Sequence, residues 1–176
     1  VLFAGLWEPR PPPATPVPVA PALQGEIEAV VRERVLARDD LALIVRYHPS
    51  DWTQYPRLPD EPRIHFSEPP REPIHPLILA SQAVVVQTST VGLESAVGGK
   101  PVISVENSPA AHVWFSLAQQ GVSTPAATPS DLPQVLNAAL AGHGRAADPS
   151  YRSDGLASRR VAAVVTKALM GRLAVA

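Results

Sequence analysis

The sequence lacks cysteine altogether, and it contains only one methionine and two lysines among its 176 residues. Without cysteine the protein cannot use a disulfide scaffold, a thiol nucleophile or a cysteine-ligated metal site. Its 15 Lys and Arg residues nearly balance its 16 Asp and Glu residues, which excludes a strongly basic nucleic-acid-binding protein and an acidic-tail protein. No apolar run approaches the roughly 18 residues of a membrane-spanning helix, and no charged-then-apolar secretion signal opens the chain.

Proline is abundant instead, with 21 residues, which is about twice the usual share. The prolines gather in residues 9–21 and 56–76. Because proline lacks an N–H and fixes φ, we expect these stretches to be loops outside the central strands and helix interiors. The hydrophobic fraction of 45% allows a packed core, so we expect one domain over residues 1–176. Its first residue already lies in an apolar run, and we therefore expect it to be a fragment of a longer two-domain protein.

Between the loops, short apolar runs alternate with segments of helical periodicity. We predict strands at residues 1–6, 41–47, 63–66, 83–87 and 101–105. We predict helices at residues 22–38, 73–81, 90–97 and 112–120, one near 132–140 that begins at Thr128-Pro129 or Ser130, and one around 161–169. This alternation predicts an α/β fold, a Rossmann-like doubly wound parallel sheet flanked by helices. Ligands of such sheets bind at the carboxyl ends of the strands.

One strand end combines hydroxyl side chains with a helix start. The apolar run at residues 83–87 leads into Thr88, Ser89 and Thr90, where the next helix begins, and Gly92 and Glu94 follow within it. Free backbone N–H groups and the helix dipole favour an anion at this place, so the segment could cradle a phosphate that Gly92 lets approach closely. Ordinary N-capping by Ser or Thr explains the same residues. Glu94 could bind a ribose diol or simply complement the helix dipole.

A histidine ends the second predicted strand, in Arg46-Tyr47-His48-Pro49. The proline favours an extended conformation at His48, which places its imidazole at the carboxyl edge of the sheet. There it could donate to a phosphate or act as an acid on a leaving group, or it could bond only a loop carbonyl. Arg46 alternates with His48 on the same face and could add positive charge or pair with an acid.

Other strand ends carry weaker candidates. Gly5 could let a loop approach a ligand, Phe66 could form a wall for a base, and Glu106 could face a sugar. The remaining histidines show no metal-ligand spacing, so we expect no metal site. The sequence also lacks the glycine fingerprint of dinucleotide-binding enzymes, which counts against an NAD enzyme.

Two segments together resemble a known enzyme superfamily. Residues 44–49, Ile-Val-Arg-Tyr-His-Pro, resemble the His-Pro strand end of nucleotide-sugar glycosyltransferases with the two-Rossmann GT-B fold. Similar strings occur in bacterial capsule transferases and in the glycerophosphotransferases of teichoic acid synthesis. Residues 80–94, continuing to Gly99-Lys100-Pro101-Val102-Ile103, resemble the Ser/Thr block of these enzymes. UDP-N-acetylglucosamine 2-epimerases share the fold and a related block.

The resemblance implies that this chain is the C-terminal, donor-binding half of such an enzyme. It assigns Ser89, Thr90 and His48 to the donor phosphates, with His48 as the catalytic residue, and it assigns Glu94 to the ribose. The donor would be a UDP-, CMP- or CDP-linked sugar, with no cofactor, and the acceptor a cell-surface glycan or glycolipid. Gln82 replaces an Asp found in many members, and the epimerase pattern Asp-Ser-Gly-Gly is missing, which favours a transferase over an epimerase.

The resemblance also implies the setting of the protein. The partners would be the nucleotide-activated sugar and the missing N-terminal Rossmann half, and no nucleic acid is expected. The parent enzyme would be cytoplasmic, with peripheral association at the inner face of the membrane as an option. Two alternatives stay open: a UDP-sugar 2-epimerase, and a non-catalytic Rossmann-like module that binds a partner.

Overall fold

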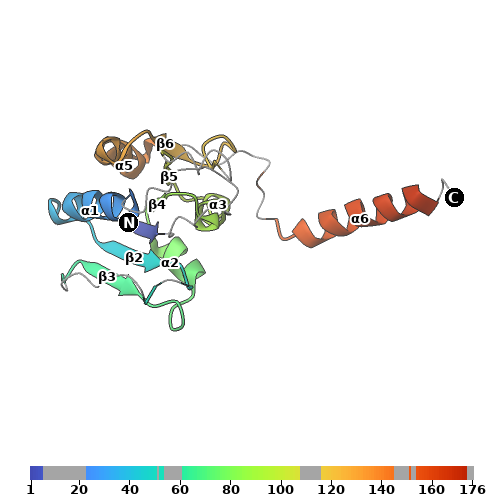
Figure 1. The fold of residues 1–176 in the computed structure, drawn as a ribbon, viewed down its shortest axis with the longest axis horizontal. Helices are drawn as coiled ribbons and strands as arrows, with labels where there is room; N and C mark the ends of the chain where they lie inside the picture. Colours follow the sequence, from blue (N-terminus) through green and yellow to red (C-terminus); the bar gives the residue numbers. More distant parts are fainter. Residues whose placement is uncertain are drawn as a thin grey trace, which may run out of the picture.

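Six parallel strands form one sheet in the order β3-β2-β1-β4-β5-β6 (Figure 1). The computed structural model describes residues 1–5, 23–50, 52–53, 61–107, 116–144, 151 and 154–173. The strands are β1 (Leu2–Gly5), β2 (Leu43–Tyr47), β3 (Ile64–Ser67), β4 (Val84–Val86), β5 (Val102–Val105) and β6 (Thr124–Ala126). This order is that of a Rossmann domain, so the predicted fold class is confirmed.

Helices cover both faces of the sheet. Helices α1 (Leu23–Leu36) and α5 (Leu132–Ala138) pack on one face, where Phe3 and Val85 point. Helices α2 (Ile74–Ala80) and α3 (Thr90–Val97) contribute to the core on the other face, with Leu2 and Val84. Because both faces are buried, β4 reads as three consecutive valines rather than as an alternating pattern.

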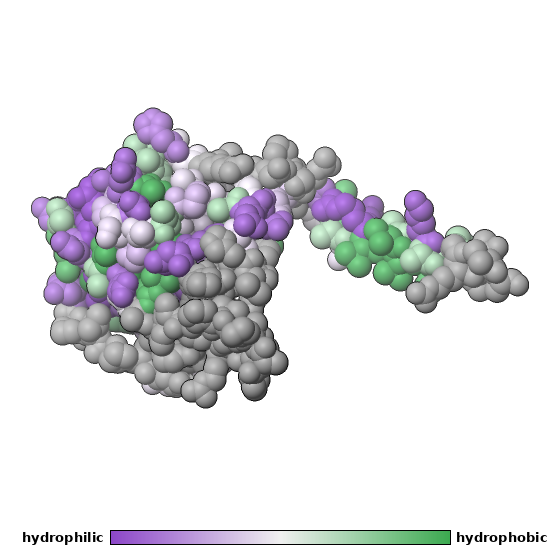
Figure 2. Space-filling view, turned by 45° about the horizontal axis from the view of Figure 1, so that its top comes forward, coloured by the Kyte–Doolittle hydropathy of each residue, from purple (hydrophilic) through white to green (hydrophobic). Residues whose placement is uncertain are grey.

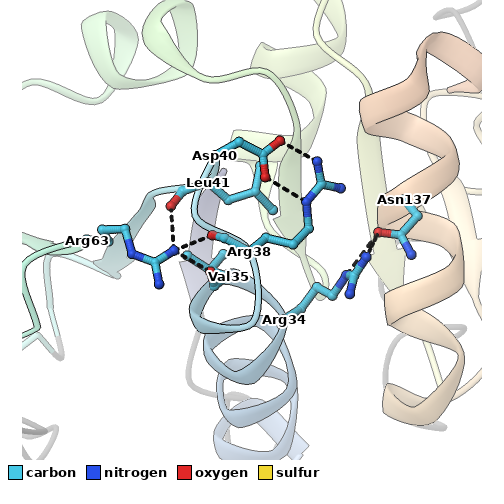
Figure 3. Close-up of polar contacts among 7 residues, drawn as sticks. All are labelled: Arg34, Val35, Arg38, Asp40, Leu41, Arg63 and Asn137. Carbon is cyan, nitrogen blue, oxygen red and sulfur yellow. Dashed lines mark hydrogen bonds and ion pairs between the residues drawn. The ribbon is translucent and has the colours of Figure 1, made fainter.

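Helix α1 presents one apolar face to the sheet, because Ile27, Val31 and Val35 recur every four residues. All three side chains are fully buried. Its carboxyl end is closed by a cation from another segment (Figure 3). The Arg63 guanidinium donates to the carbonyls of Val35 at 2.7 Å and Leu36 at 2.9 Å, and also to those of Arg38 and Leu41. The Val35 and Arg38 carbonyls also accept from backbone N–H groups, so Arg63 adds a charged donor to the carboxyl end of α1 and complements the helix dipole.

The helices beside β3 and β4 have recognisable starts and ends. Pro73 is the N-cap of α2, and Pro76 lies in its first turn, where a missing N–H costs no helical hydrogen bond. Helix α3 ends at Gly98, and Gly99 follows with a φ of 74°, a conformation that glycine adopts without strain. Pro62, Pro69 and Pro70 lie in turns, as predicted, and the proline cluster of residues 9–21 lies outside the described residues.

Two predictions about the second half of the chain were wrong. The sequence did not predict β6, which pairs with β5 at the edge of the sheet and contains Pro125. Of the helix predicted at residues 112–120, the first four residues lie outside the described part, and the rest form turns. The buried carboxylate of Glu106 accepts hydrogen bonds from the Ser116 hydroxyl and, at 3.0 Å, from the Ala118 N–H. These bonds hold an irregular turn, and they also occupy the carboxylate that the sequence offered for a sugar.

The predicted last helix is confirmed as α6 (Ala157–Leu173), which extends away from the sheet in Figure 1. Apolar side chains on this helix are strongly exposed, namely Val161, Val164, Val165, Leu169 and Met170. Figure 2 shows hydrophobic surface grouped on α6. The described part of the chain does not cover this apolar surface.

Candidate functional site

A cavity of about 230 Å³ opens at the carboxyl ends of the central strands. Strand β1 lies between β2 and β4 in the sheet. After β1 the chain adds β2 and β3 on one side of it, and then adds β4, β5 and β6 on the other side. The strand order therefore reverses between β1 and β4, which is the switch point of the sheet. The lining comes from the ends of β1 and β2 and from the first turns of α2 and α3, through Ala4, Gly5, Arg46, Tyr47, His48, Pro49, Ile74, Ser89, Thr90, Val91 and Glu94. Apart from Glu106, whose carboxylate holds a turn, nine site residues were predicted, and the fold brings six of them together.

The first turn of α3 forms one wall of the cavity. Ser89 is its N-cap, in extended conformation, and its hydroxyl oxygen accepts from the Val91 N–H at 3.3 Å. The capping interpretation of this serine is therefore confirmed. Thr90 is exposed beside it, and the amino end of an eight-residue helix faces the cavity. This end carries the positive pole of the helix dipole, so it suits an anion.

His48 lies opposite this helix start, at the end of β2. Its Nδ1 is 2.7 Å from the Ser50 hydroxyl and 3.3 Å from the Ser50 backbone nitrogen. Because a backbone N–H can only donate, this contact makes Nδ1 the acceptor and leaves the hydrogen of a neutral imidazole on Nε2. The local turn thus selects the tautomer in which Nε2 is the donor.

Arg46 has only 7% of its surface exposed, although it lines the cavity. Its Nη1 donates to the Ser67 hydroxyl at 2.7 Å and to the Glu72 carbonyl at 2.6 Å. Burial lowers the pKa of this guanidinium, and the charge of the Glu72 carboxylate opposes the shift. Arg46 therefore joins β2 to β3 and to the segment that begins α2, and it places a positive charge beside the cavity.

Glu94 stands one turn into α3 and reaches the cavity from its side. Its Oε2 lies 3.2 Å from Nε2 of His75, which belongs to α2. The contact joins the two helices that flank the cavity. His75 is a residue to which the sequence gave no role, since neither periodicity nor spacing showed that α2 and α3 would meet here.

Three predicted residues do not line the cavity. The ring of Phe66 lies on the α1 face, 4.9 Å from the Arg32 guanidinium and 6.3 Å from the Tyr47 ring. Thr88 is half-buried ahead of the helix start. Gly92 is buried against the sheet, where an added Cβ would be 2.6 Å from Cδ1 of Leu117. The glycine thus serves close packing of α3 on the sheet.

His75 contacts Glu94 without lining the cavity. The lining residues to which the sequence gave no site role are Ala4, Tyr47, Pro49, Ile74 and Val91. Tyr47 lines the cavity, and its hydroxyl donates to Glu28 on α1 at 2.6 Å. Its place directly before His48 is the signal that could have identified it. Ile74 forms an apolar part of the wall, and its approach depends on how α2 packs, which no local signal gives.

Within the described ranges, no group of His, Asp and Glu side chains is arranged to hold a metal ion. A search of the same residues for a helix long and apolar enough to cross a bilayer finds none.

Comparisons with known proteins bear on the fold alone. No protein-family model matches the sequence, and a search of curated proteins finds no match. Among solved structures, a protein from Listeria monocytogenes assigned as a UDP-N-acetylglucosamine 2-epimerase aligns with 96% of this chain at 21% identity and a TM-score of 0.62. The structure of S. aureus MnaA with UDP aligns with 96% of this chain at 16% identity and a TM-score of 0.62. The chain shares their fold. It spans 44% and 45% of the lengths of these two proteins.

Proposed function

We propose that this chain is the nucleotide-sugar-binding Rossmann domain of a larger enzyme. The observation that carries the proposal is the cavity at the switch point, where the α3 amino end, His48 and Glu94 meet. Hydrogen-bond donors lie at one part of this cavity and a carboxylate at another, which suits a ligand with an anionic end and a hydroxyl-bearing end. The shared fold with a protein solved in complex with UDP supports this ligand class.

The anionic end would bind at the start of α3. Ser89 and Thr90 would present hydroxyls and backbone N–H groups to the phosphates, and His48 would donate from Nε2. The buried charge of Arg46 would raise the local positive potential without direct contact, because its Nη1 is occupied by Ser67 and Glu72. Gly5 lines the cavity with its backbone, and its missing side chain leaves room for Gln24, since an added Cβ would lie 2.7 Å from the Gln24 amide nitrogen.

For the parent enzyme we propose group transfer as the first candidate reaction. In sugar transfer the bond between the sugar carbon and the nucleotide phosphate oxygen would break, and in polyol phosphate transfer the bond between the two phosphates would break. In both cases negative charge develops on the departing nucleotide phosphate. Donors already held in place at His48 and the α3 amino end would stabilise that charge, which is electrostatic catalysis at a developing anion. A sugar or polyol phosphate would pass to a cell-surface glycan or glycolipid, and the base that activates the acceptor would belong to another part of the enzyme.

Epimerisation of a UDP-sugar is the second candidate. The fold shared with the Listeria protein over 96% of this chain favours it. The sequence lacks the epimerase pattern Asp-Ser-Gly-Gly, which favours transfer. Activity assays of the whole parent enzyme with UDP-N-acetylglucosamine, with and without an acceptor glycan, would separate the two.

We also propose that a second Rossmann half of the same protein covers the apolar surface of α6. Val164 is 69% exposed and Met170 is 68% exposed, and water contact at several such side chains on one helix is unfavourable. The chain also spans less than half the length of the two solved structures that share its fold. The site formed by this chain alone would then be open, so we expect weak nucleotide binding and no turnover.

Titration of the ¹⁵N-labelled chain with CMP, CDP and UDP tests the binding proposal. We expect the amide resonances of Ser89 and His48 to shift with at least one of these nucleotides. The amide of Leu41 serves as an internal control, because it precedes β2 at the opposite edge of the sheet. If none of the three nucleotides shifts Ser89 or His48, the donor-site proposal is wrong and the non-catalytic module becomes the better interpretation.

A further inference from the structure

The cavity has walls from two helices that are held to each other at several points. Near its pocket end, α2 contacts α3 through His75 and Glu94, with 3.2 Å between Nε2 and Oε2. At the other end of α2, the Lys100 ammonium donates to the Leu79 carbonyl at 2.6 Å. Lys100 follows α3 directly after Gly99, so this bond joins the carboxyl ends of the same two helices.

The start of α2 is also held to the sheet. The buried Arg46 guanidinium binds the Glu72 carbonyl, two residues before α2 begins. His65 on β3 binds the carboxylate of the same Glu72 at 3.0 Å, and this hydrogen bond lowers the pKa of Glu72. His75 is thus presented to α3 from a helix whose position is fixed by groups outside the pair.

We propose that His75 is a positioning residue that fixes the Glu94 carboxylate for recognition of a ribose hydroxyl. This inference rests on the proposed binding of a nucleotide. A glutamate side chain loses rotamer freedom when it binds a ligand, and a partner that already holds it reduces that loss. His75 contacts Oε2, and a carboxylate has about four acceptor sites on its two oxygens, so enough of them remain to accept from a diol.

The preference for ribose over deoxyribose measures this role directly. We would determine the affinities of the whole chain for UDP and for 2′-deoxy-UDP by NMR titration, in the wild type and in the variants H75A, H75Q and E94Q. A hydrogen bond to a charged group corresponds to a preference of about tenfold or more for UDP in the wild type. We expect E94Q and H75A each to reduce it to about threefold or less, because E94Q removes the charge of the acceptor and H75A removes the group that holds this acceptor in place. H75Q retains a donor near the position of Nε2 and should keep most of the preference.

The H65A variant is a matched control. His65 also pairs with a glutamate, at 3.0 Å, but this glutamate, Glu72, does not line the cavity, whereas Glu94 does. We expect H65A to keep the wild-type preference, because the Arg46 guanidinium still holds the Glu72 carbonyl ahead of α2. The affinity for 2′-deoxy-UDP should be the same in H75A as in the wild type. His75 has 75% of its side chain exposed, so its substitution should leave the fold intact.

The outcomes separate the two proposals. A wild type that binds neither nucleotide contradicts the proposed function and this inference with it. A wild type that binds UDP, combined with an H75A variant of unchanged preference, overturns the positioning role and leaves the proposed function standing. A wild type without any preference for ribose overturns the positioning role as well. Equal losses in H75A and H75Q would also overturn it, since the proposed mechanism is a polar contact from the side chain at position 75 to the Glu94 carboxylate.

Discussion

The packing of α3 on the sheet can be tested by replacing Gly92 with alanine. A Cβ at this position would lie 2.6 Å from Cδ1 of Leu117, 3.1 Å from Cγ2 of Val86 and 3.4 Å from Cγ1 of Val102. All three neighbours are at most 1% exposed, so they have little room to move. Overpacking of this kind costs about 1–3 kcal/mol, and the better helix propensity of alanine returns about 0.5–1 kcal/mol. We expect Gly92→Ala to lower the free energy of unfolding by about 1–2 kcal/mol.

Urea denaturation followed by circular dichroism measures this loss. The matched control is Gly25→Ala in α1, where an added Cβ meets nothing within 4 Å, and we expect no loss of stability there. In a Leu117→Ala background the further cost of Gly92→Ala should fall, because the nearest clashing atom is gone. A Gly92→Ala variant as stable as the wild type would refute the packing argument. If that variant also bound UDP more weakly, the phosphate-approach hypothesis for Gly92 would regain support.

Substitutions at three further positions test individual contacts. Arg63→Ala should lower the free energy of unfolding by about 2 kcal/mol, because the carbonyls at the end of α1 lose a charged donor. Arg63→Lys should recover part of this loss in the same urea assay. Equal stability of the wild type and both variants would contradict the capping role. Ser89→Ala should lower the free energy of unfolding by about 1 kcal/mol through loss of the N-cap, and it should also raise the dissociation constant for UDP. If the variant is less stable but binds UDP as the wild type does, the Ser89 hydroxyl has no role in binding. His48→Ala, at an exposed position, should leave the unfolding curve unchanged and weaken UDP binding by about tenfold; unchanged turnover of this variant of the full-length parent would remove His48 from the mechanism.

The sheet could be predicted because its strands carry their own signal. Val84, Val85 and Val86 form an apolar β-branched run that only a strand buried on both faces requires. The edge strand β6 has no such signal, since its middle residue is a proline and its pairing depends on β5. The helix expected around residue 116 shows the opposite case. Its apolar spacing is real, but a buried carboxylate from Glu106, ten residues earlier, takes hydrogen bonds from Ser116.

The site was predictable to the extent that parallel strand ends meet at one edge. This rule alone places His48 opposite Ser89. Side chains along a strand alternate between the two faces of the sheet, so Phe66 shares a face with Ile64 and turns toward α1. This alternation could have excluded Phe66 from the predicted site. Contacts between helices followed no comparable rule. The meeting of His75 with Glu94 depends on the packing of α2 beside α3, which involves residues distant in the sequence.

The arrangement along α3 also bears on how a nucleotide would lie in the cavity. Glu94 follows Ser89 by five residues, which corresponds to about 7.5 Å along the helix axis. Ser89 marks the positive end of the helix dipole, while Glu94 carries a negative charge farther along the same helix. A nucleoside diphosphate has its charge at one end and its ribose hydroxyls farther along, so the two polarities match in one direction only. In the reverse direction the phosphates would face the Glu94 carboxylate, and the repulsion between like charges would oppose binding.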